Sequence, residues 1–171
     1  VGLGKGGKAK APVPPKCEGK WIVLESEDLE LKFAPPQVRH ERCSDIKFSP
    51  DGRFIAVGNA DNFIDIYTVP GHYATNQSEF RRVGQLKGHS SFILHIDWSL
   101  DSQFLQSNCG AHELLYWALY TDDGKWKPHQ EKSSSKMRDE QWATQTSIYG
   151  WALRGIWPED ADGTDINAVH A

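Results

Sequence analysis

The sequence predicts an all-β fold of consecutive four-stranded antiparallel sheets, on two observations. The first is the stretch 88–119, where apolar residues alternate with polar ones from Phe92 to Trp98 and polar turns separate short runs. Alternation with period two and turns at short intervals indicate successive β-hairpins. The second observation is an internal repeat, because residues 44–69 match that stretch when the sequence is shifted by 50 positions.

The repeat is carried by apolar and turn positions, which are the positions that fix a β unit. The matched pairs are Ile46 with Ile96, Phe48 with Trp98, Asp51 with Asp101, Phe54 with Phe104, and Tyr67 with Trp117. Self-similarity at a fixed period is typical of repeat architectures, whose units bury their apolar faces against one another. We therefore expect residues 44–69 and 92–119 to form adjacent, equivalent units.

The unit resembles a WD40 repeat, one blade of a β-propeller. Gly88-His89 opens it, and Tyr116-Trp117 stands where Trp-Asp would usually close it. A propeller closes with about four to eight blades, and this sequence supplies about two complete blades and parts of two others. The prediction is a WD40-type propeller segment, an excerpt of a larger and tandem propeller.

Pro, Gly and polar clusters divide the chain into five parts. Residues 1–36 are expected to be the end of a preceding blade with a basic loop, 37–87 a WD40-like blade, 88–127 a second such blade, 128–141 a polar loop, and 142–171 the start of a further blade. Expected strands cover 21–24, 29–33, 45–48, 54–58, 63–67, 80–86 and 125–127 in addition to those within 88–119. The residues 147–157 are expected to form the first strands of the last unit, with Trp151, Leu153 and Trp157 in their apolar set.

The composition excludes several classes of protein. The formal net charge of −4 and the isoelectric point near 6.0 argue against a nucleic-acid partner, which calls for a basic surface. Three widely spaced cysteines indicate reduced thiols of the cytoplasm and no disulfide framework. No apolar run approaches the ~20 residues of a membrane span, so no membrane partner is expected.

Two segments near the end carry a more specific resemblance. The run at 155–158 reads GIWP, and the run at 162–167 reads DGTDIN. Together with Asp97-Trp98-Ser99 and the run at 113–117, they resemble the echinoderm microtubule-associated protein-like family. The resemblance implies two joined propellers and a protein of the cytoskeleton that associates with tubulin or microtubules, in the cytoplasm or in the axoneme of a cilium or flagellum. The alternative is a generic WD40 scaffold or adaptor for another protein complex.

The resemblance also implies structural roles within the blades. The expected structural residues are His89, Asp61, Trp98, Trp117 and Trp157. The sequence departs from the pattern at two places, with Arg39 where the second unit should open and Ala111 where the third should have its turn aspartate. We therefore expect the His–Ser/Thr–Asp–Trp hydrogen-bond network of WD40 repeats to be incomplete in both blades.

Basic loops are the candidate partner-binding sites. The candidates are Lys5, Lys8, Lys10, Lys16, Lys125, Trp126 and Lys127. Lysines could contact an acidic tubulin surface, and a tryptophan could anchor the contact. The alternative is that these loops are simply solvated, since exposed ion pairs contribute little.

Catalytic, cofactor and metal sites are not expected. His40, Cys43 and Asp45 are close in sequence but accompany no nucleophile or oxyanion motif. The acidic run at 160–165 lacks the spacing of a calcium-binding EF-hand, and the Gly-rich run at 4–8 lacks the spacing of a phosphate-binding loop. The sequence therefore predicts a protein that acts by binding other proteins.

Overall fold

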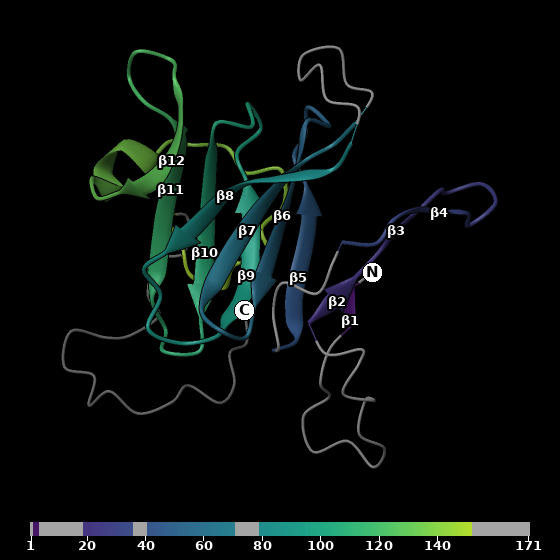
Figure 1. Ribbon diagram of the computed structural model, residues 1–171. Coiled ribbons are helices and arrows are strands. Elements are labelled where there is room, and N and C mark those ends of the chain that lie inside the picture. The colour runs from purple at the N-terminus through teal and green to yellow at the C-terminus, as the bar shows by residue number, and fades with distance from the viewer. Residues whose placement is uncertain (1, 4–18, 36–40, 71–78, 152–171) are drawn as a thin grey trace, which may run out of the picture.

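The computed structural model describes residues 2–3, 19–35, 41–70 and 79–151, which form an almost purely β structure (Figure 1). Within that part of the chain, the only helix is a short 3₁₀ helix at Ser134–Met137. No helix there is long and apolar enough to cross a membrane. The all-β prediction is confirmed.

The second unit is one four-stranded antiparallel sheet. It contains β5 (Cys43–Phe48), β6 (Phe54–Asn59), β7 (Phe63–Thr68) and β8 (Arg81–Lys87), hydrogen-bonded in that order. Each strand pairs with the one before it, so the sheet is the meander that the alternating pattern predicts.

The third unit repeats this arrangement. It contains β9 (Ile93–Trp98), β10 (Phe104–Cys109), β11 (Leu114–Tyr120) and β12 (Trp126–Glu131), again in sequential order. This sheet lies beside the sheet of the second unit, and Figure 1 shows the two as neighbouring layers. The two sheets are adjacent four-stranded blades.

The last strand of the third unit extends further than expected. We expected it to end near 127, with a polar loop over 128–141, but β12 continues to Glu131. Pro128 does not interrupt β12, because β12 is the outermost strand and a residue without an amide N–H is tolerated on a sheet edge. The segment that follows also contains the 3₁₀ helix, so only part of it is loop.

The 50-residue repeat is reproduced in the strand register. Strands β5 and β9 begin and end 50 positions apart, and so do β6 and β10. Ile46 pairs with Val57 in one sheet, and Ile96 pairs with Ser107 in the other. The predicted equivalence of Ile46 and Ile96 is therefore confirmed, although Ile96 is fully buried and Ile46 only half-buried.

The turns after β5 and β9 use the same side-chain bond. Ser49 Oγ donates to Asp51 Oδ1 over 2.6 Å, and Ser99 Oγ donates to Asp101 Oδ1 over the same distance. Such bonds from Ser and Asp to nearby groups hold a turn locally. The amide of Asp51 also donates to Ser102 Oγ over 3.1 Å, so the two turns contact each other across the blades.

The main hydrophobic core lies between the two blades. Its buried members include Phe54, Ala56, Ile64, Ile66, Leu86, Ile93, Ile96, Trp98, Leu105, Trp117 and Leu119. The sheets approach each other closely at Gly58, where a Cβ atom would lie 2.7 Å from Ile93 Cγ2. A side chain at that position would force the blades apart, so the glycine is required by the packing.

The first unit is more broken than the sequence suggested. The strand expected over 21–24 divides at Ile22 into β2 (Lys20–Trp21) and β3 (Val23–Leu24). Strand β2 pairs with β1 (Gly2–Leu3), and β3 pairs with β4 (Leu31–Phe33).

Strand β4 also begins later than expected. Leu29 has a φ of 59°, a left-handed conformation that a strand does not contain. It therefore lies in the turn before β4. The unit packs on the second blade through Trp21, whose ring meets that of Tyr67 edge to face at 4.9 Å.

The start of the last unit also differs from the expectation. We expected strands from Ser147 onward with Trp151 in the apolar set, but residues 147–151 are not in a strand and Trp151 is 45% exposed. Trp142 makes one isolated bridge to Ser99. The remaining residues of this unit, including Trp157, lie outside the described residues.

Candidate interaction surface

The third blade contains a buried hydrogen-bond network centred on Ser107. His89 Nε2 lies 2.7 Å from Ser107 Oγ, and Trp117 Nε1 donates to the same oxygen over 2.8 Å. His89 Nδ1 lies 3.2 Å from Glu113 Oε2. The network therefore joins a loop histidine, β10, β11 and a carboxylate in one chain of contacts.

The expectation that this network is incomplete in the third blade was wrong. Glu113, two residues after Ala111, supplies the carboxylate that the turn aspartate would have supplied. The longer glutamate side chain can reach the histidine from the later position. In the second blade, Asp61 is half-buried in the turn between β6 and β7. Its structural role and the incompleteness of the network in that blade stay predictions.

The network determines the protonation states of His89 and Glu113. Burial lowers the pKa of His89 below its ordinary value, and the neighbouring Glu113 opposes this only in part. The backbone N–H and the hydroxyl of Ser90 hold the pKa of Glu113 down at about 2. His89 is consequently neutral and Glu113 ionised near neutral pH.

The neutral His89 predicts a loss of stability on acidification. Its folded-state pKa is below the unfolded value of about 6.5, so between these values the unfolded chain binds more protons and the free energy of unfolding falls as pH falls. Urea unfolding of the full-length parent protein at about pH 7.5 and about pH 5.5 measures this. In a His89→Gln variant we expect the free energy of unfolding to fall less between these two pH values. An unchanged fall would contradict the assignment of the pH dependence to His89.

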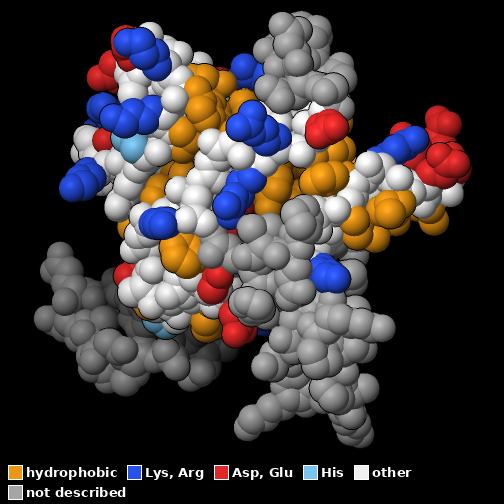
Figure 2. Space-filling view, in the orientation of Figure 1, with side chains coloured by type: hydrophobic (Ala, Val, Ile, Leu, Met, Phe, Trp, Pro, Cys, Tyr) orange, Lys and Arg blue, Asp and Glu red, His pale blue; other side chains and the backbone are white. Residues whose placement is uncertain are grey.

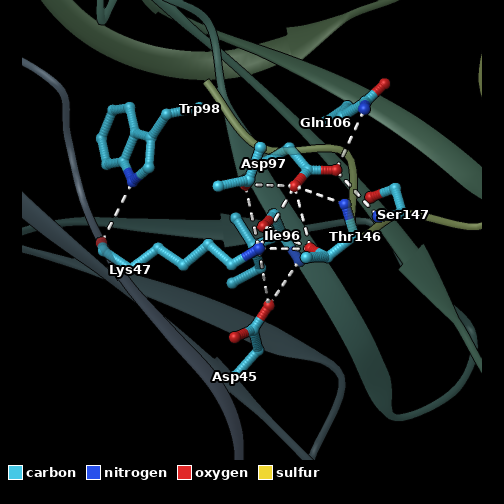
Figure 3. Close-up of polar contacts among 9 residues, drawn as sticks. Asp45, Lys47, Ile96, Asp97, Trp98, Gln106, Thr146 and Ser147 are labelled. Atoms are coloured by element: carbon cyan, nitrogen blue, oxygen red, sulfur yellow. Dashed lines mark hydrogen bonds and ion pairs between the residues drawn. The ribbon is translucent and has the colours of Figure 1, made fainter. Parts of the chain in front are cut away.

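A second polar network joins the two blades at Asp97, on β9 (Figure 3). The Asp97 side chain is fully buried. Lys47, from β5 of the other blade, places its Nζ 3.2 Å from Asp97 Oδ1. The neighbouring Asp45 accepts a bond from the amide of Ile96 over 2.9 Å.

The segment after β12 supplies most of the other donors to Asp97, and Gln106 Nε2 on β10 donates to its Oδ2 over 3.1 Å. The Thr144 hydroxyl donates over 2.5 Å, the Thr146 amide over 3.0 Å and the Ser147 amide over 2.8 Å. Burial alone would raise the pKa of Asp97, but these bonds outweigh it and hold that pKa well below its usual range. We call Asp97, Lys47, Thr144, Thr146 and Ser147 the Asp97 cluster. Sequence reasoning missed it, because its members are about 50 residues apart.

The predicted basic candidates are placed only in part. Lys5, Lys8, Lys10 and Lys16 lie outside the described residues. Lys125 is 80% exposed at the β11–β12 hairpin, where it pairs with Asp123, and Lys127 is exposed on β12.

Trp126, between these two lysines, is part of the packing between the blades. Its ring stacks on Phe54 with centroids 4.6 Å apart, and its Nε1 donates to Val83 O over 3.2 Å. Only part of its surface is exposed. A role of Trp126 in partner binding stays a prediction.

Two further groups of residues contain potentially reactive or metal-binding side chains. The Cys43 thiol is held near the Lys20 carbonyl and Asn59, and burial raises its pKa to about 11, so it is protonated near neutral pH. Within the described ranges, His89, Cys109 and Glu113 place possible metal-ligand atoms within 4.8 Å of one another. All three already share hydrogen bonds through Glu113 Oε2.

Comparison with known proteins identifies the family. The model of the echinoderm microtubule-associated protein second beta-propeller matches residues 13–171. The chain belongs to the echinoderm microtubule-associated protein family. Its blades are thus those of an echinoderm microtubule-associated protein propeller, and the resemblance drawn from the GIWP and DGTDIN runs is confirmed.

Individual relatives agree with the family match. The chain is 44% identical to echinoderm microtubule-associated protein-like 1 of Homo sapiens over 151 residues, which are 88% of this chain and 17% of the relative. It is 43% identical to the 77 kDa echinoderm microtubule-associated protein of Strongylocentrotus purpuratus over 153 residues, 88% of this chain and 20% of the relative. The chain thus spans about a fifth of the length of these family members.

Proposed function

We propose that this chain is part of a non-catalytic, microtubule- or tubulin-associated WD40 propeller protein of the cytoskeleton. The observation that carries the proposal is the family match over residues 13–171, whose members are named for microtubule association. The polar groups inside the blades support it, because His89, Glu113 and Asp97 are engaged in hydrogen bonds that hold the fold. A setting in cilia or flagella, with axonemal partners, is the narrower form of the same proposal.

Co-sedimentation of the full-length parent protein with microtubules tests the function. The parent is expected to pellet with microtubules. If it fails to pellet at every salt concentration, the hypothesis of a generic WD40 scaffold or adaptor is favoured.

The basic loop provides a second prediction. Neutralising Lys5, Lys8, Lys10 and Lys16 to Gln should weaken microtubule binding modestly, since exposed charges each contribute little. The control is the set of Lys→Arg changes at the same positions, which keeps the charge and should bind like wild type. Unchanged binding of the Gln variant across a salt series would place the contacts elsewhere in the protein.

The loop at Trp126 needs a different variant. Removing Trp126 would disturb its stacking on Phe54, so loss of binding would not distinguish a contact from a packing defect. Neutralising the flanking Lys125 and Lys127 keeps the packing, and weaker binding of that variant would support a contact at this hairpin.

A further inference from the structure

The outermost strands of the two blades carry a row of cations. Figure 2 shows Lys and Arg side chains spread over β8, β12 and the turns beside them, with fewer acidic side chains on the same face. Strand β8 reads RRVGQLK and contains no carboxylate. We call the exposed cations of these strands and of the residue after β12 the outer cation strip; they are Arg81, Arg82, Lys87, Lys127 and Lys132.

The two strands of the strip are adjacent because β8 and β12 pack directly on each other. Trp126 Nε1 donates to the Val83 carbonyl over 3.2 Å. A Cβ atom at Gly84 would lie only 3.1 Å from Pro128 Cγ. The outer strands that carry the cations of the two blades are thereby held against each other.

Several cations of the strip lack a carboxylate partner. Arg82 lies 3.5 Å from the buried Asp65, and the Lys87 ammonium lies 5.5 Å from the centre of the Phe63 ring. Within the described part of the chain, no ion pair involves Arg81, Lys127 or Lys132. A protein of net charge −4 thus concentrates unneutralised positive charge on one face.

We propose that the outer cation strip is a docking surface for an extended acidic peptide segment of a partner protein. The proposal names a surface and a partner chemistry for the protein association proposed above, and it rests on that function. A row of positive side chains along two adjacent strands is complementary to a row of Glu or Asp side chains, and such complementarity favours encounter and orientation. Pro128 removes one edge amide from β12, so recognition works through side-chain charge.

Cations on outer strands have another use, which is to keep sheet edges from pairing with other chains. That use requires only that the edges carry charge, and it predicts no affinity for an acidic peptide. The two uses are therefore separable by a binding measurement.

The test is binding of a fluorescent glutamate peptide of about 12 residues, long enough at ~3.3 Å per residue to follow both strands. The full-length parent protein should bind it, more weakly as NaCl rises from about 50 to about 300 mM. Changing Arg81, Lys127 and Lys132 to Gln should lower the affinity about tenfold, because several weak pairs are lost together.

A charge-matched control separates the strip from net charge. Lys20, Lys32 and Arg42 lie around β2, β4 and the start of β5, away from the strip in Figure 1. Their triple change to Gln should leave the affinity within about twofold of wild type. Equal losses in both variants, or no loss in the strip variant, would overturn the proposal.

Microtubule co-sedimentation of the unaltered parent, run in parallel, distinguishes this proposal from the function on which it rests. If the parent pellets but the strip variant keeps its peptide affinity, the strip proposal fails and the proposed function stands. If the parent does not pellet but the strip variant alone loses the peptide, the proposed function fails and the acidic-peptide surface stands.

Discussion

Replacing Asp97 with Asn is expected to lower the free energy of unfolding by about 3–5 kcal/mol, the range for breaking a buried ion pair by removing one partner. The carboxylate is fully buried, faces Lys47, and accepts further hydrogen bonds from Thr144, Thr146, Ser147 and Gln106. An amide in its place points an N–H at those donors and leaves the Lys47 ammonium without its closest counter-charge. Chemical unfolding of the full-length parent protein measures the change.

An exposed carboxylate provides the matched control. Asp122→Asn removes the same charge from the exposed β11–β12 hairpin and should alter stability by less than about 0.5 kcal/mol. A Lys47→Met change combined with Asp97→Asn should cost less than the sum of the two single changes, because the partners are coupled. If Asp97→Asn unfolds at the wild-type denaturant concentration, the Asp97 cluster does not hold the blades together.

Replacing Trp98 with Ala is expected to have an effect of similar size. The side chain is 1% exposed between the blades, its ring stacks on Phe54 at 6.4 Å, and its Nε1 donates to the Lys47 carbonyl over 3.1 Å. Large-to-small changes of buried aromatic residues remove about 3–5 kcal/mol of stability. The unfolding midpoint in urea reports it.

Trp151 is the comparison for this change, since it is 45% exposed. Trp151→Ala should cost about 1 kcal/mol or less. Trp98→Phe, which keeps a ring but loses the hydrogen bond, should fall between the two. Equal stability of the Trp98→Ala and Trp151→Ala variants would contradict the burial of Trp98.

The strands of the two full blades could be predicted because their signal is local. Period-two alternation and turn residues place β5 to β8 within about two residues, and the repeat ties β9 to β5. The ends of β2, β3 and β12 depend on which strand lies alongside, so the sequence could not specify them. Trp21 and Val23, for instance, are neighbours in sequence but pair with different strands.

The polar networks were harder to predict for a different reason. Glu113 provides the carboxylate partner of His89, which the repeat pattern would place at position 111. Only the structure shows that the longer Glu113 side chain reaches the histidine. Asp97 is an ordinary polar residue of an alternating strand when seen in sequence. Its donors come from segments roughly 50 positions before and after it, and their meeting follows from the packing of successive blades.

The spacing of the Asp97 cluster has a consequence for the order of events during synthesis. Lys47, Asp97 and Thr144 leave the ribosome in that order, and at about 5–20 residues per second roughly 2–10 s separate each from the next. During the second interval the Asp97 carboxylate has its cation but not the hydroxyl and amide donors of the later segment. We therefore expect the hydrogen bonds around Asp97 on β9 to be completed only when the following unit has been synthesised. Each blade would then reach its final packing only after the next unit has left the ribosome.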